Sequence, residues 1–132
     1  LVGRLHDMHP ADPFEAARHE AMMGHVEDLR AQIGHTMQIA DLEAKKAARE
    51  RMSATYLPSW ADQAEASIAA GPFFGGEKLH VVDFKLLLTV RWIRSGSLDH
   101  VPSTVFEDAP KLNRLHDAVD AHPSVRAWYA KR

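Results

Sequence analysis

The sequence contains no cysteine among its 132 residues. This absence excludes disulfide frameworks, zinc sites built on thiolates and a cysteine nucleophile, and it fits a reducing compartment. Long apolar runs are also missing, since no stretch approaches the ~20 residues that a membrane-spanning helix needs. Residues 1–20 have no signal-peptide pattern. We therefore expect a cytoplasmic protein with no membrane partner.

An excess of one charge is lacking as well. The 16 lysines and arginines and the 18 aspartates and glutamates are interleaved, and the formal net charge is −2. Binding to a phosphate backbone needs a continuous positive surface, so we do not expect a nucleic-acid partner. The nine histidines are scattered over different expected helices and form no HExxH motif. We therefore expect no metal site.

Alternation with the period of a β-strand is absent, and the residues that mark the starts and ends of elements are those typical of helices. Asp12 precedes Pro13, and Glu15 stands at the third helical position. This arrangement predicts an N-cap, a first-turn proline and a capping-box acid at the start of a helix. The apolar positions that follow recur every three or four residues, and they are Met22, Val26, Leu29, Ile33, Met37 and Ala40. They predict one long helix with a single stripe that faces a core.

The rest of the chain contains shorter helical segments. The polar residues 41–50 predict a solvated helix or a frayed connection, and the segment interrupted by Pro58 predicts a helix that ends near Gly71. A strong helix is expected over residues 81–93. Two short helices should follow, one begun by "EDAP" with Asp108 as its cap and one in "HPSVRAWYAKR". The sequence predicts an all-α fold, a helical bundle of about five helices in one domain.

One acid, Asp83, stands at the front of the apolar run in "GGEKLHVVDFKLLL". A buried, unpaired carboxylate costs several kcal/mol, so this acid needs a partner or belongs to a site. If a helix begins at Val81, His80 is its N-cap and the carboxylate of Asp83 can accept the backbone N–H of His80. Leu79 and Phe84 are spaced as a hydrophobic staple. We favour structural capping by His80 and Asp83 over the alternative of a catalytic acid in a pocket.

The segment "FFGGEKLHVVDFKLLL" resembles the capping motif at the start of the buried helix in the C-terminal helical domain of cytosolic glutathione S-transferases. The family's serine or threonine cap is His80 here, and an imidazole nitrogen accepts an amide proton less well. The first thirty residues, with "GR", "EAA" and "VEDLR", are similar to the junction between the two domains in the pi and sigma classes. The end of the chain, "HPSVRAWYAKR", is similar to the closing helix of the family. The resemblance implies a pi- or sigma-like protein of bacterial type. Residues 1–9 would end a missing thioredoxin-like domain, and residues 10–132 would form the helical domain.

This resemblance implies conjugation of the glutathione thiol to hydrophobic electrophiles, with glutathione as co-substrate, in a homodimer of two-domain subunits. In the family, the tyrosine or serine that stabilises the thiolate lies on the thioredoxin-like domain. We therefore assign no catalytic residue in this chain, and we expect the chain alone to be inactive. The competing function is a non-catalytic protein-interaction scaffold, because related helical domains occur in translation factors and synthetases.

The resemblance also implies where glutathione and the electrophile bind. Asp28 in "VEDLR" matches the family aspartate that reaches across the dimer toward the γ-glutamyl ammonium of glutathione on the other subunit. The electrophile pocket would be lined by residues one to three turns further on, namely Ala31, Gly34, His35 and Gln38. The pi class has a tyrosine where Gln38 stands, so one aromatic wall is lost. For all five residues, an ordinary surface position is the alternative.

Overall fold

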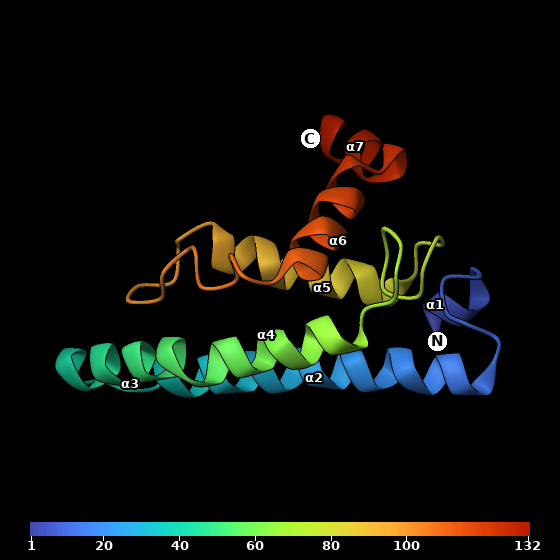
Figure 1. The fold of residues 1–132 in the computed structure, drawn as a ribbon. Coiled ribbons are helices and arrows are strands. Elements are labelled where there is room, and N and C mark those ends of the chain that lie inside the picture. The colour runs from blue at the N-terminus through green and yellow to red at the C-terminus, as the bar shows by residue number, and fades with distance from the viewer.

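The computed structural model describes all 132 residues and contains seven helices and no strand (Figure 1). The helices are α1 (Val2–Leu5), α2 (Pro13–Met37), α3 (Leu42–Ala54), α4 (Tyr56–Ser67), α5 (Val81–Arg94), α6 (Pro110–Ala121) and α7 (Pro123–Ala130). The predicted all-α class is confirmed. The two helices beyond the expected five are α1 and α3, and of the two alternatives for residues 41–50 the structure has the helix.

The long helix α2 forms the base of the molecule, and α3 and α4 return along it (Figure 1). Helix α5 lies on this layer, and α6 packs on α5 and carries α7 at its far end. α5 is therefore the central helix. Its inward positions are almost fully buried, and they are Val82, Leu86, Leu87, Val90 and Ile93. None of the seven helices combines the length and the apolar character that crossing a bilayer requires.

Helix α2 begins where the sequence predicts, with the Asp12 carboxylate accepting the N–H of Glu15 at 2.9 Å. The prediction that Glu15 acts as a capping-box acid is wrong, because its carboxylate pairs with Arg18 at 2.8 Å. Four residues of the predicted stripe are buried, namely Met22, Val26, Leu29 and Ile33. The last two are not, since α2 ends at Met37, which is half exposed, and Ala40 lies beyond the helix.

The start of α6 corrects another prediction. Asp108 does not cap this helix, and Ala109 at the N-cap position makes no side-chain hydrogen bond. Instead, the carboxylate of Glu65 on α4 accepts the N–H of Lys111 at 3.1 Å and that of Leu112 at 2.6 Å. An acid from a distant part of the chain thus supplies the cap that the adjacent acid was expected to give, and it fixes α6 to α4.

Candidate functional site

Asp28 lies on an open face of α2. Its side chain is exposed and forms no ion pair or side-chain hydrogen bond within the chain. Its negative charge acts on Tyr56 of α4, whose pKa is raised first by burial and then by the charge of Asp28. A side chain built at Gly24, one turn earlier, would meet no atom within 4 Å. The Asp28 carboxylate is therefore accessible to a cation that approaches from outside.

A rigid contact between α2 and α4 supports this face. The ring of His25 stacks on Trp60 with the two ring centroids 4.8 Å apart. The indole N–H of Trp60 donates to the carbonyl of His25 at 2.8 Å, and Nε2 of His25 lies 3.0 Å from the carbonyl of Trp60. Because these contacts come one turn before Asp28, they fix the position from which its carboxylate projects.

Three of the four predicted pocket residues share the side of α2 that carries Asp28. A helix turns about 100° per residue, so Ala31, His35 and Gln38 lie within about 80° of Asp28 around the axis. These three side chains are exposed, whereas Gly34 is partly buried. Two grooves flank α5, one between α2 and α5 and one between α5 and α7, and none of the four residues lines either of them. Their role in a pocket stays a prediction.

The first groove runs between α2 and α5 and has a volume of about 400 Å³. It is lined by Val26, Arg30, Lys85, Leu88, Thr89 and Trp92. Since two residues turn a helix by about 200°, Arg30 points to the side of α2 opposite Asp28. The two faces of α2 therefore offer an accessible carboxylate on one side and a hollow on the other.

Positive side chains outnumber negative ones at this groove. The ammonium of Lys85 pairs with the carboxylate of Glu27, and this hydrogen bond, followed by the charges of Lys85 and Arg30, lowers the pKa of Glu27. Arg30 is exposed and has no ion pair or side-chain hydrogen bond of its own. The two cations and one anion leave the groove with a net positive charge.

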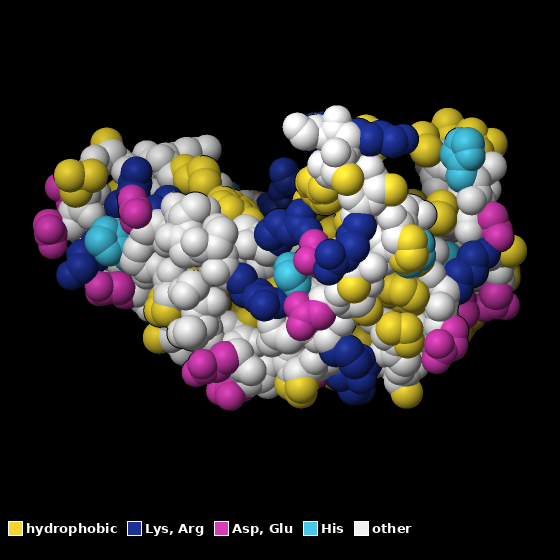
Figure 2. Space-filling view, turned by 90° about the horizontal axis from the view of Figure 1, so that it is seen from above, with side chains coloured by type: hydrophobic (Ala, Val, Ile, Leu, Met, Phe, Trp, Pro, Cys, Tyr) yellow, Lys and Arg dark blue, Asp and Glu magenta, His cyan; other side chains and the backbone are white.

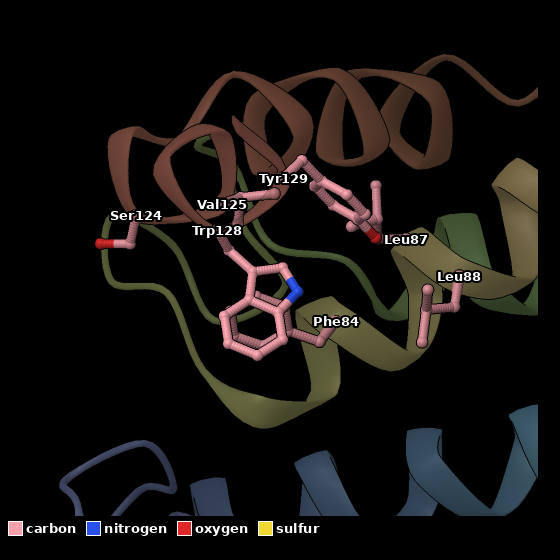
Figure 3. Close-up of a pocket in the computed structure, with 7 residues that line it drawn as sticks. All are labelled: Phe84, Leu87, Leu88, Ser124, Val125, Trp128 and Tyr129. Atoms are coloured by element: carbon pink, nitrogen blue, oxygen red, sulfur yellow. The ribbon is translucent and has the colours of Figure 1, made fainter. Parts of the chain in front are cut away.

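The second groove lies between α5 and α7 and has a volume of about 350 Å³. Figure 3 shows its lining residues, which are Phe84, Leu87, Leu88, Ser124, Val125, Trp128 and Tyr129. Trp128 and Tyr129 are 57% and 47% exposed, and Arg91 holds the Tyr129 ring by a hydrogen bond of 2.9 Å to its hydroxyl. The lining contains no carboxylate, imidazole or amine, and six of its seven residues are hydrophobic, so this surface is suited to apolar contact.

Asp83 is fully buried at the start of α5. Its two oxygens accept the N–H of His80 at 2.8 Å and the N–H of Phe74 at 2.7 Å. Burial raises the pKa of the Asp83 carboxyl to about 6, and the two hydrogen bonds oppose this rise. The His80 ring is placed as in a capping box, yet its buried Nδ1 has no hydrogen-bond partner within normal geometry. Neither groove includes Asp83.

Three histidines meet beside this helix start. The ring of His19 lies edge to face with His80 at 4.9 Å and with His9 at 6.1 Å between centroids. Burial, followed by the charges of His80 and His9, lowers the pKa of His19 to about 4. Each ring has a buried nitrogen without a hydrogen bond, although Nε2 of His9 lies 3.4 Å from the Glu20 carboxylate. The three rings are not arranged to hold a metal ion. Neutral His19 is thus part of the packing.

The fold, centred on a buried and capped α5, defines a known class of helical domain. Residues 27–132 match the family model described as glutathione S-transferase, C-terminal domain, and the chain belongs to this family. No curated protein sequence is significantly similar to it.

Two solved structures share the fold. Rat hPGDS complexed with a quinoline gives a TM-score of 0.79 at 17% identity over 96% of this chain. The Pi-class glutathione S-transferase of Onchocerca volvulus gives 0.76 at 17% identity over 99% of this chain. The chain spans only 60% and 61% of the lengths of these two proteins.

Sequence reasoning missed the residues of the α2–α5 groove. Arg30 follows directly after the buried Leu29, and Lys85 interrupts the apolar run of α5. A cation directly after a buried leucine of α2, together with a cation inside the apolar run of α5, is a signal that could have identified the groove. The bond from Phe74 to Asp83 gave no such signal, because it depends on the path of the connection between α4 and α5.

Proposed function

We propose that this chain is the helical domain of a glutathione transferase of pi- or sigma-like class. The full-length protein would conjugate the glutathione thiol to hydrophobic electrophiles, as a cytoplasmic homodimer. The observation that carries the proposal is the unpaired, accessible carboxylate of Asp28 on the open face of α2, in a chain of this family. An exposed carboxylate suits the γ-glutamyl ammonium of glutathione, because a charge-assisted hydrogen bond is stronger than a neutral one.

The two sides of α2 would serve different sites. Asp28 would face glutathione bound mainly by the second subunit. Ala31, His35 and Gln38, on the same side of α2, and Gly34, about 120° from Asp28 around the axis, would lie near the electrophile. The groove that contains Arg30 lies on the opposite side of α2 and would belong to the pocket of its own subunit. This division is supported by the angle of about 200° between positions 28 and 30.

The reaction needs a thioredoxin-like domain in addition to this chain. The thiolate is the nucleophile, so the protein must lower the pKa of the glutathione thiol and hold the electrophile beside it. We propose that the tyrosine or serine for the first task lies outside this chain, that residues 1–9 end the thioredoxin-like domain, and that the chain alone is inactive. The exposed rings of Trp128 and Tyr129 on α7 would contact that domain.

A direct test uses the full-length protein with glutathione and a neutral chlorodinitrobenzene. We expect glutathione-dependent turnover by a species with the mass of a dimer in sedimentation. Protein that remains a folded dimer but neither binds glutathione nor consumes its thiol would refute the proposed activity and favour the scaffold.

A further inference from the structure

We propose that the α2–α5 groove selects electrophiles that carry an acidic group, with the guanidinium of Arg30 as the recognising cation. This inference rests on the proposed transferase function and names a substrate class for it. It places the acidic electrophile in this groove of its own subunit, in place of the position beside Ala31, Gly34, His35 and Gln38 that the family resemblance implies.

The shape and lining of the groove suit a small, largely apolar molecule. Its volume of about 400 Å³ falls within the ~300–1,000 Å³ that is usual for ligand sites. The apolar walls come from Val26 on α2 and from Leu88 and Trp92 on α5, and Leu88 is 56% exposed. A residue so apolar and so exposed offers contact area that nothing in this chain covers.

The charge of the groove narrows the choice of ligand. Lys85 is engaged by Glu27, which compensates its positive charge. Arg30 lies near enough to Glu27 to lower its pKa, yet it makes no ion pair of its own, so one positive charge is uncompensated. A guanidinium presents a planar set of donors that matches a carboxylate with two parallel hydrogen bonds. An aromatic electrophile with a carboxylate would satisfy both the walls and the charge.

A suitable substrate is a chloronitrobenzoate with the chlorine ortho to the nitro group. The glutathione thiolate attacks the carbon that bears chlorine, a C–S bond forms, the C–Cl bond breaks, and chloride leaves with the bonding pair. The proton of the thiol is released to water. The carboxylate takes no part in these bonds, so it is free to pair with Arg30 throughout the reaction.

The test compares this benzoate with the benzamide of the same substitution, which has nearly the same shape and no charge. The full-length protein, Arg30→Gln and Arg30→Lys are assayed with both substrates, and Arg126→Gln on the exposed face of α7 serves as the control. In Arg30→Gln we expect the ratio of kcat/KM for the benzoate to kcat/KM for the benzamide to fall about tenfold, since one charge-assisted contact is lost. Arg30→Lys should keep most of the ratio, and Arg126→Gln all of it.

Each outcome distinguishes this inference from the proposed function. An unchanged ratio in Arg30→Gln would overturn the role of Arg30, while turnover of either substrate would leave the transferase function standing. A failure of the unsubstituted protein to use glutathione with both substrates would instead overturn the proposed function. Equal unfolding midpoints for the four proteins would show that the ratio reports recognition and not folding.

Discussion

The N–H of Phe74 donates to Oδ1 of Asp83 at 2.7 Å, across nine positions of the sequence. The other oxygen of the same carboxylate accepts the N–H of His80 at 2.8 Å. One buried side chain therefore closes the start of α5 and also holds the connection from α4 against it. The acid that stands out in the sequence is a structural joint between two elements.

Loss of this joint should destabilise the protein. Asp83→Ala leaves the N–H groups of Phe74 and His80 without a partner, and we expect the free energy of unfolding to fall by about 1–3 kcal/mol. Chemical denaturation of both forms measures the change, and protein that still folds should keep its affinity for glutathione. An unchanged midpoint together with altered glutathione binding would show that Asp83 belongs to a site.

Asp83 and His19 should make opposing contributions to the pH dependence of stability. Folding raises the pKa of Asp83 from 3.8 to about 6, so the folded state takes up a proton below pH 6 and this group adds stability as the pH falls toward 3.8. Folding lowers the pKa of His19 from 6.5 to about 4, so the unfolded state takes up a proton first. This group removes stability as the pH falls from 6.5 to 4.

Two variants separate these contributions. Asp83→Asn removes the contribution that opposes that of His19, so the free energy of unfolding should decrease more steeply from pH 6.5 to 4 than in the unsubstituted protein. In His19→Leu the slope should change in the opposite direction, because the contribution of Asp83 is no longer opposed. Urea denaturation at a series of pH values gives both slopes. Parallel pH profiles for the two variants would show that neither group titrates as its burial requires.

The two acids near the start of α6 give a matched pair. Glu65→Ala should lower the free energy of unfolding by about 1–2 kcal/mol, because two N–H groups at the helix start lose their acceptor. Asp108→Ala should leave it nearly unchanged, since Asp108 caps nothing. Thermal or chemical denaturation of the two variants decides between them, and the reverse order of effects would restore the local cap that the sequence suggests.

The sequence predicted what depends on neighbouring residues. The cap at Asp12 and the buried stripe from Met22 to Ile33 follow from spacing along a single helix, and the structure has both. The start of α5 at Val81 follows for the same reason. Local patterns suffice there because a helix repeats every 3.6 residues, whichever element packs against it.

The features that the sequence did not predict depend on distant residues. Glu65 displaces Asp108 as the cap of α6 only because α4 lies beside that helix start. The α2–α5 groove brings Arg30 and Lys85 together although they are 55 positions apart in the sequence. The pairing of helices decides such contacts, and periodicity carries no information about it.

The central claim is that Asp28 meets the ammonium of glutathione, and calorimetric titration of the full-length dimer tests it most directly. Glutathione and an analogue without the γ-glutamyl amino group are each titrated into the unsubstituted protein and into Asp28→Asn. We expect Asp28→Asn to weaken glutathione binding by about 1–2 kcal/mol and to leave the affinity for the analogue nearly the same, because the analogue has no cation for Asp28 to contact. Equal affinity of both proteins for glutathione would contradict the account and leave Asp28 as an ordinary surface aspartate.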